Sequence, residues 1–344
     1  MAVVKADGYG HGAVTVANAA LKGGAESLGV ATLQEGIDLR QSGIKCSILV
    51  LGNLTNPQEL GACIDWNLMP TISSFQESLL CNNLAHEENR KINVHLKVDT
   101  GMTRLGCDLD EAPDLIQAID QFSNLSLEGI YSHLAMADGD LEGKSSQVTA
   151  QQKQKFDKLL INLSERNQPI CIHLANSAGT LRDTELHYDM VRVGLALYGY
   201  NPINGKIGKS LNLQPALSVK ARLTFVREVP AGKGVSYGHR YITNTFRRLG
   251  VVAIGYADGV ARSLSGKISV LINGEFCPQV GAITMDQLLV DVTHITEIKV
   301  GDIVTLLGSD GKEMITAYDW SEVIGSIPWE ILCSFKYRLP RVLI

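Results

Sequence analysis

The sequence predicts an α/β fold, a (β/α)8 barrel of the TIM type followed by a second, mainly β domain. Three observations predict it. Short apolar runs alternate with helically spaced segments through the first 200 residues, a Pro/Gly/Asn-rich break follows at 201–210, and β-branched runs dominate after it. Apolar runs between amphipathic helices are typical of parallel strands covered on the outside. We expect domains at 1–205 and 206–344.

The first domain contains the eight strand-like runs that a closed barrel needs. They lie at 2–5, 28–32, 47–51, 68–72, 92–98, 127–133, 169–174 and 190–195. Helical spacing occurs between them, at 12–22, 33–42, 73–85, 109–123 and 146–166. A doubly wound open sheet is the alternative that the same alternation allows.

The second domain has β-branched runs separated by turn residues. The runs lie at 217–229, 249–255, 268–273 and 302–307. The pairs Asn273-Gly274 and Asp310-Gly311 are strong turn signals. This pattern predicts short strands joined by tight turns.

The composition is that of an ordinary globular protein, with 45% hydrophobic and 19% charged residues. A net charge of −5 and a pI near 5.9 argue against nucleic acid or an anionic membrane as the main partner. No apolar run approaches the ~20 residues that span a bilayer, and no signal peptide is indicated. The seven scattered cysteines include no C-x-x-C pair, which favours reduced thiols in a cytoplasmic protein over disulfides or a zinc site.

The first apolar run ends in Lys5, and the glycine-rich turn after it contains Tyr9 and His11. A lysine at the end of a buried strand is costly to keep charged, since burial disfavours the ammonium form. A neutral amine attacks carbonyl groups, which makes Lys5 a candidate for a Schiff base. A surface lysine at a strand end is the alternative, and for an isolated lysine it is the commoner case.

Ionisable and polar residues follow several of the predicted strands. The carboxyl ends of the strands are where a (β/α)8 barrel carries its reacting groups, with phosphate often held after strands seven and eight. The residues at these ends are Lys5, Lys97, Asp99, Arg104, His133, His173, Asn176, Ser177, Arg192, Gly194 and Leu195. The sequence therefore predicts a polar cluster at one rim of the barrel.

Each of these residues also has a plainer interpretation. Asn176 or Ser177 could simply cap a helix, but Arg192 and Gly194 beside them favour an anion such as phosphate. His133 could be a core histidine, a metal ligand or a flat face that stacks on a bound ring. Because no H-x-H or H-E-x-x-H spacing is present, we expect no metal.

Two cations at the rim need a physical explanation. Arg104 lies in a turn and could be solvated, or it could bind a carboxylate or phenolate if buried. Lys97 points inward in an alternating strand, where an unpaired ammonium is costly.

In the second domain Tyr237 and Tyr256 lie in turns, and the segment 281–287 is also turn-like. Taken singly, each of these segments is more simply a structural turn.

Taken together, these motifs resemble those of bacterial alanine racemases, pyridoxal phosphate (PLP) enzymes with a barrel and a C-terminal β domain. The motifs in chain order are AVVKADGYGHG, HLKVDTGMTRLG, GIYSHLAMAD, HLANSAG, VRVGLALYG, VSYGHRY, GYADG and MDQ. The resemblance extends to the closing segment 337–341 and so covers essentially the whole chain.

The resemblance implies a role for each rim residue. Lys5 holds PLP as a Schiff base, and the phosphate lies against Tyr9, Ser177, Gly194 and Leu195, with Asn176 nearby. His133 stacks on the ring. Arg192, with His173 as its partner, faces the pyridine nitrogen and keeps that nitrogen unprotonated. The cofactor is then a weaker electron sink.

The resemblance further implies two opposed bases, Lys5 for D-alanine and Tyr237 for L-alanine. The tyrosine comes from the partner subunit, so the active site is shared within a homodimer. Arg104, Met285 and Tyr256 contact the substrate, with Asp286 beside them. A carboxylated Lys97 would be an anion that orients Arg104. The implied function is to supply D-alanine for peptidoglycan.

Two departures from the family pattern stand out. Trp329 occupies a position where many members have a tyrosine near the active-site entrance. Members also carry a few dozen residues before the lysine motif, whereas Met1 lies only four residues before Lys5.

A racemase of broader amino-acid or serine specificity is one alternative function. A non-catalytic PLP-binding protein and a metal-dependent barrel hydrolase are two others.

Overall fold

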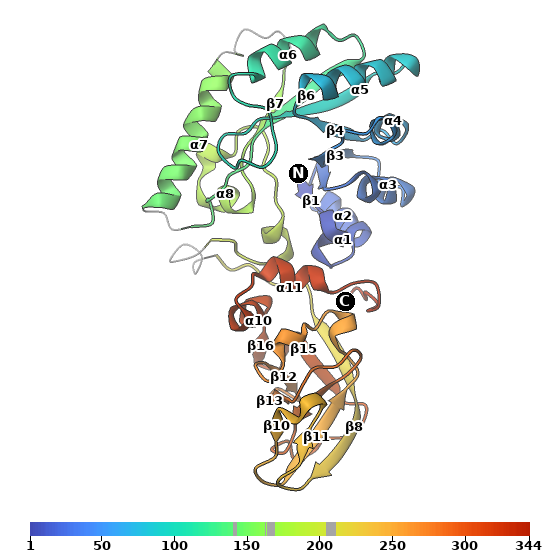
Figure 1. Ribbon diagram of the computed structural model, residues 1–344, viewed down its shortest axis with the longest axis vertical. Coiled ribbons are helices and arrows are strands. Elements are labelled where there is room, and N and C mark those ends of the chain that lie inside the picture. Colours follow the sequence, from blue (N-terminus) through green and yellow to red (C-terminus); the bar gives the residue numbers. More distant parts are fainter. Residues whose placement is uncertain (140–142, 162, 164–168, 204–210) are drawn as a thin grey trace. The chain divides into compact units, whose positions relative to one another are not determined.

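The computed structural model describes the chain except for residues 140–142, 162, 164–168 and 204–210 (Figure 1). The described residues form two compact units, one of Met1–Gly8 with Gly12–Leu213, the other of Tyr9–His11 with Gln214–Ile344. The expected domain boundary between 205 and 206 lies outside the described residues.

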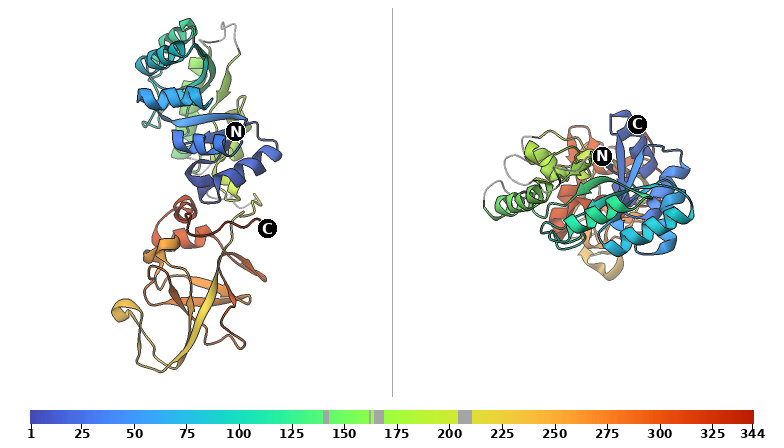
Figure 2. Two further views of the ribbon diagram at one scale, coloured as in Figure 1. Left: turned by 90° about the vertical axis from the view of Figure 1, so that its right-hand side faces the viewer. Right: turned by 90° about the horizontal axis from the view of Figure 1, so that it is seen from above.

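The first unit is built on a curled parallel sheet of seven strands in sequential order. The strands are β1 (Ala2–Val3), β2 (Ser27–Val30), β3 (Ser47–Asn53), β4 (Met69–Ile72), β5 (Ile92–Lys97), β6 (Leu125–Tyr131) and β7 (Cys171–His173). The helices are α1 (Lys5–Tyr9), α2 (Ala13–Lys22), α3 (Leu33–Gln41), α4 (Pro57–Asp65), α5 (Phe75–Glu87), α6 (Ala112–Gln121), α7 (Lys144–Ile161) and α8 (Ser177–Arg182). Figures 1 and 2 show α3, α4 and α5 side by side along the outside of the sheet.

The sheet closes through a minimal eighth strand. Only Val193 of the expected run at 190–195 pairs, as a parallel bridge to Ala2. Val3 N donates to Val193 O at 2.8 Å, and Val193 N donates to Met1 O at 3.0 Å. The predicted barrel is therefore confirmed, and the open doubly wound sheet is wrong.

The strands are apolar because both of their faces are covered. All four residues of β2 are buried, and Ile48, Leu49 and Val50 of β3 are fully buried. The helix that follows β2 begins at a capping box, in which Thr32 accepts from Glu35 N and the Glu35 carboxylate accepts from Thr32 N. Helix α4, which the sequence did not single out, begins at the Asn56 cap with Pro57 in its first turn.

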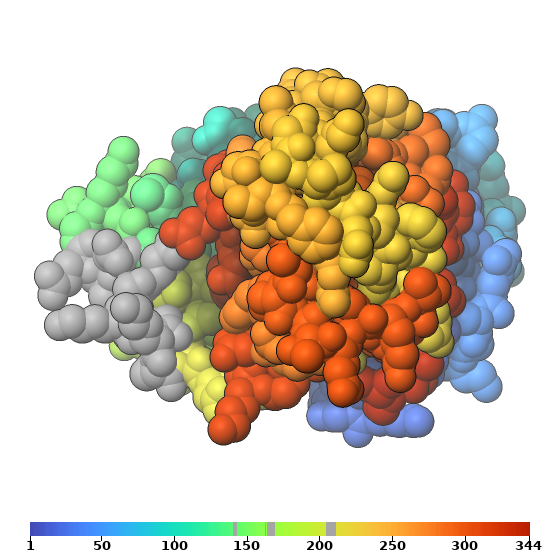
Figure 3. All heavy atoms as spheres, turned by 90° about the horizontal axis from the view of Figure 1, so that it is seen from below, coloured from blue at the N-terminus to red at the C-terminus, as the bar shows by residue number. Residues whose placement is uncertain are grey.

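The second unit is mainly β, as predicted, and its strands pair antiparallel. Its main sheet has the strand order β12-β13-β14-β11-β8-β15-β16. The atoms of this unit are coloured yellow to red in Figure 3. These strands are β8 (Val219–Val229), β11 (Arg247–Val252), β12 (Ser269–Ile272), β13 (Glu275–Val280), β14 (Leu288–Asp291), β15 (Ile303–Asp310) and β16 (Glu313–Ile315). A small ribbon, β9 (Gly234–Val235) with β10 (Tyr241–Ile242), lies beside them, and two unpredicted helices follow, α10 (Ala317–Ile324) and α11 (Pro328–Ser334).

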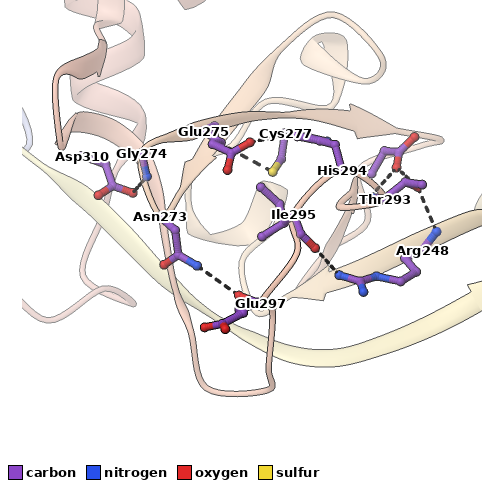
Figure 4. A network of polar contacts seen from close by, with 11 residues as sticks. Arg248, Asn273, Gly274, Glu275, Cys277, Thr293, His294, Ile295, Glu297 and Asp310 are labelled. Carbon is purple, nitrogen blue, oxygen red and sulfur yellow. Dashed lines mark hydrogen bonds and ion pairs between the residues drawn. The ribbon is translucent and has the colours of Figure 1, made fainter.

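Hydrogen bonds from side chains connect the turns of this unit (Figure 4). Asn273 and Gly274 join β12 to β13 with positive φ values of 53° and 79°, as a type I′ hairpin requires. Gly274 N donates to the Asp310 carboxylate at 3.1 Å, and Asn273 Nδ2 donates to Glu297 O at 3.4 Å. Arg248 holds the same loop region through Ile295 O.

All seven cysteines are described and carry free thiols. Within the described parts of the chain, no helix is both long and apolar enough to cross a membrane.

Candidate active site

The carboxyl ends of the barrel strands bring together most of the predicted rim residues. Lys5 follows β1, Lys97 ends β5, and His173 ends β7. His133 lies just beyond β6, and Arg192 immediately precedes the bridging Val193. The first unit therefore holds one compact group of cations and imidazoles.

Arg192 is the centre of this group and is only 4% exposed. Its two terminal nitrogens donate to the carbonyls of Ser132, His173 and Leu174 at 2.6 to 3.0 Å. They also lie 3.0 Å from His173 Nδ1 and 3.3 Å from His133 Nδ1. Burial lowers the pKa of Arg192 to about 10, which leaves it a cation at neutral pH. Among the described residues its partners are dipoles rather than carboxylates.

One nitrogen of Arg192 is left for something else. Nε donates to none of these acceptors, and it is not among the enclosed polar atoms that lack a partner. That N–H therefore has no hydrogen-bond acceptor among the described residues. A neutral acceptor, such as the nitrogen of an unprotonated pyridine, matches that donor.

The two imidazoles beside Arg192 are neutral. Burial, reinforced by the Arg192 charge, lowers the pKa of His133 and of His173 well below the usual value. His173 stacks on Tyr131 with ring centres 4.7 Å apart and an angle of 9° between the planes. An uncharged His133 is suited to lie against an aromatic ring.

Lys97 is buried without a counter-ion. It is 6% exposed, its Nζ lies 5.4 Å from the centre of the Tyr131 ring, and no ion pair of the described residues includes it. Burial, helped by the charges of Arg104, Arg192 and Lys5, lowers the pKa of Lys97 to about 8. Its amine therefore becomes neutral, and nucleophilic, far closer to physiological pH than an ordinary lysine.

The segment after β7 offers a hydroxyl to an anion. Ser177 Oγ accepts from Gly194 N at 2.8 Å and from Ala196 N at 3.3 Å, which leaves its own O–H to donate elsewhere. Asn176 caps α8 by accepting from Gly179 N at 3.0 Å. The Asn176 oxygen thus serves as a helix cap, the simpler of the two roles considered for it. Ser177 and the Gly194–Leu195 backbone remain suited to phosphate.

Lys5 begins a backbone turn of unusual hand. Ala6, Asp7, Gly8, Tyr9 and Gly10 all have positive φ, between 48° and 79°. Left-handed residues other than glycine cost about 1–2 kcal/mol each, so this turn must be held by its neighbours.

Two carboxylates hold the turn. The Glu35 carboxylate accepts from Ala6 N at 2.7 Å while also accepting from Ala31 N at 2.7 Å. The Asp7 carboxylate accepts from Ala13 N, at the start of α2, at 2.8 Å. Tyr9, which groups with the second unit, is buried, and burial raises its pKa to about 12.

The second-domain candidates form their own cluster within the second unit. Tyr237 is 72% exposed and borders an open depression of about 460 Å³ lined by Ser236, Gly238, His239 and Thr284. Ser236 shapes this turn, with a φ of 59° and an Oγ that donates to Ala282 O at 2.8 Å.

Tyr256 and Met285 are held close to each other by their backbones. Tyr256 N donates to Thr284 O at 2.9 Å, and Ala257 N donates to Met285 O at 3.0 Å. Their side chains are 42% and 53% exposed. Asp286 next to them pairs with Arg338 at 2.8 Å. The unit thus presents uncovered tyrosine and methionine side chains together.

Family comparison identifies both units. Residues 1–202 match the family model described as alanine racemase, N-terminal domain, and residues 216–343 match alanine racemase, C-terminal domain. The chain belongs to the alanine racemase family.

Relatives and solved structures agree along the whole chain. It is 63% identical to an alanine racemase of Prochlorococcus marinus over 344 residues, all of this chain and 89% of that protein. An alanine racemase structure from Bacillus anthracis with bound L-Ala-P is 36% identical, with a TM-score of 0.91 over 100% of this chain and 87% of that one. One from Clostridium difficile has a TM-score of 0.89 at 35% identity, over 97% and 86%. The predicted resemblance to alanine racemases is confirmed.

The sequence analysis missed two residues of the Arg192 group. His95 Nδ1 lies 2.9 Å from His173 Nε2, and Tyr131 stacks on that same imidazole. The available signal was strand spacing, since His95 and Lys97 are two apart and share a face of β5. Arg104, in contrast, is exposed in the loop after β5 and makes no hydrogen bond to another described residue. Trp329 lies half-buried in α11.

Proposed function

We propose that this chain interconverts L-alanine and D-alanine with PLP by a two-base mechanism in the cytoplasm, and so supplies D-alanine for peptidoglycan. The observation that carries the proposal is full-length identity to named alanine racemases combined with the Arg192-centred group at the barrel rim.

The rim residues fit PLP by the chemistry of their donors. Lys5 supplies the amine for the Schiff base, and Ser177 with the Gly194–Leu195 backbone and Tyr9 would hold the phosphate, with Asn176 nearby. Neutral His133 would lie against the ring, and the unused Nε–H of Arg192 would meet the ring nitrogen. Arg192 remains a cation that cannot give up its proton, so the ring nitrogen would stay unprotonated.

PLP, when bound, withdraws electrons from the α-carbon of the amino acid and makes its α-proton acidic. Racemisation then needs one group to remove that proton and another to return one on the opposite face. We assign these roles to the Lys5 amine, facing D-alanine, and to Tyr237 of the partner subunit, facing L-alanine. The exposure of Tyr237, Tyr256 and Met285 supports a homodimer in which the second unit of each chain completes its partner's site.

Arg104, Met285 and Tyr256 would then contact the alanine substrate, and Asp286 would lie beside them. Lys97 would carry a carbamate, an anion that pairs with Arg104. This assignment would remove a buried cation that forms no ion pair among the described residues.

The proposal is tested by replacing Tyr237→Phe. We expect exchange of the α-proton with deuterated solvent to be suppressed for L-alanine far more than for D-alanine, by roughly 100-fold, since a positioned general base contributes 10²–10⁴-fold. Single-turnover mass spectrometry with each isomer measures this.

The control is Tyr241→Phe, a half-buried tyrosine of β10 in the same unit, which should leave both rates unchanged. Equal losses for the two isomers would refute the two-base assignment. A purified chain without a visible absorption band that borohydride bleaches would refute PLP.

A further inference from the structure

We infer that His95 is a positioning residue for the reaction: it accepts the Nε2–H of His173 and thereby helps to hold His173 in the tautomer that receives Arg192. The inference rests on the proposed placement of Arg192 at the cofactor ring nitrogen. It concerns a buried pair of imidazoles that the proposed mechanism does not otherwise use.

The donor directions follow from Arg192. A guanidinium only donates, and its NH1 lies 3.0 Å from His173 Nδ1. Nδ1 of His173 must therefore be the unprotonated nitrogen, and a neutral His173 carries its proton on Nε2. That nitrogen lies 2.9 Å from His95 Nδ1, so His95 is the acceptor. The proton order thus runs in one direction, from Arg192 to His173 to His95.

The groups around His173 leave it no other favourable state. Arg192 and His95 are neighbours that disfavour its cationic form. Tyr131 covers one face of the ring. An imidazolium is disfavoured there, and the other neutral tautomer of His173 would turn its Nδ1–H toward the guanidinium, which is also a donor. Without an acceptor on Nε2, the choice between tautomers would weaken.

A β-bulge in the pairing of β5 with β6 sets the position of His95. Pairing between β5 and β6 runs Val94 with Leu127 and then His95 with Gly129, so Glu128 is an extra residue, a β-bulge. Bulges redirect side chains and occur often near active sites.

Gly129 provides the space that the imidazole fills. A Cβ at Gly129 would lie 2.3 Å from His95 Nδ1 and 2.4 Å from its Cε1. Both His95 and His173 are buried, at 3% and 0% exposure. The position next to the ring therefore accepts only a residue without a side chain.

The test compares His95→Asn with His95→Leu, two side chains of similar size of which only Asn has an acceptor at the place of Nδ1. Nitrogen NMR of the ¹⁵N-histidine-labelled holoenzyme reads the tautomer of His173 directly. We expect a neutral ring protonated on Nε2 in the wild type and in His95→Asn, between about pH 6 and pH 8. In His95→Leu we expect a mixture that includes the Nδ1-protonated form.

Kinetics and absorption test the consequence for the cofactor. We expect His95→Leu to lower kcat roughly tenfold, at the low end of the loss seen when a residue that orients a metal ligand is removed. KM for alanine should hardly change, and the visible band of bound PLP should shift. His95→Asn should stay within about twofold of wild type. Gly129→Ala should resemble His95→Leu, whereas Gly61→Ala, with nothing within 4 Å of the added Cβ, is its neutral control.

A single Nε2-protonated His173 in His95→Leu would overturn the inference, as would equal behaviour of Asn and Leu. A changed tautomer with unchanged kcat and absorption would overturn the link to Arg192, while racemase activity in the wild type would still uphold the proposed function. If His95→Leu does not fold, the comparison of His95→Asn with Gly129→Ala decides the question by the same readouts.

Discussion

Lys97 combines a buried amine with a neighbourhood of cations. Burial and the charges of Arg104, Arg192 and Lys5 bring its pKa to about 8, compared with about 10.4 for an ordinary lysine. Between about pH 8 and pH 10, Lys97 is therefore neutral while surface lysines are still protonated. In that window its Nζ can attack CO₂ and lose a proton to form a carbamate.

We predict a carbamate ¹³C signal when the protein is incubated with ¹³C-bicarbonate, growing as the pH rises through about 8. Below that pH the amine is protonated and cannot react, so the signal should decline. Lys97→Gln should abolish it, and Lys91→Gln, on the exposed surface before β5, should not. A signal that survives Lys97→Gln, or no signal in the wild type, would contradict the prediction.

At the scale of single residues, the sequence predicted the residues at strand ends but not the residue that a β-bulge positions. Lys5, Lys97 and His173 were found because apolar runs stop at them, and the structure places each at a strand end. His95 lies within a run, and its position depends on the bulge at Glu128, between Leu127 and Gly129 of β6. Nothing in the local pattern marks a bulge, because it arises from pairing with a strand about 30 residues away.

At the scale of elements, the turn after β1 shows how a strained segment is stabilised. Ala6 has a φ of 53°, a conformation that costs an L-residue about 1–2 kcal/mol relative to glycine. Hydrogen bonds from Ala6 N to Glu35 and from Ala13 N to Asp7 oppose that cost. Relief of the strain should outweigh the extra chain entropy of glycine.

We therefore predict that Ala6→Gly leaves the free energy of unfolding unchanged or raises it by up to about 1 kcal/mol. The matched control is Ala19→Gly on the exposed face of α2, which should lower it by about 1 kcal/mol. Urea unfolding of both variants measures the difference. A loss at Ala6 equal to that at Ala19 would show that the left-handed turn is not strained.

Elements with strong periodicity were predicted, and those set by distant contacts were not. The expected runs at 28–32, 47–51 and 92–98 correspond to β2, β3 and β5. The run at 190–195 forms one bridge, at Val193, next to Arg192, whose side chain donates to three carbonyls. Helix α10 follows a capping box at Thr316 and α11 begins at Pro328, and both are short signals in a β-rich sequence.

At the scale of the whole molecule, the proposed shared site makes a prediction about mixed dimers. Lys5 belongs to the first unit and Tyr237 to the second. If each site takes Lys5 from one chain and Tyr237 from its partner, a dimer of a Lys5→Ala chain with a Tyr237→Phe chain has one site with both changes and one site with neither. Each variant alone has a defect in both of its sites.

We predict that such mixed dimers, made by co-expression with two different tags and purified through both, regain about half of the wild-type activity per dimer, as two-fold symmetry requires. Homodimers of either variant should show only residual racemisation of alanine. A doubly changed chain co-expressed with wild type serves as the control, because it should place one defect in each site and lose nearly all activity. If both bases instead came from one chain, the first pair would stay inactive and the control would keep half, so the two arrangements give opposite results.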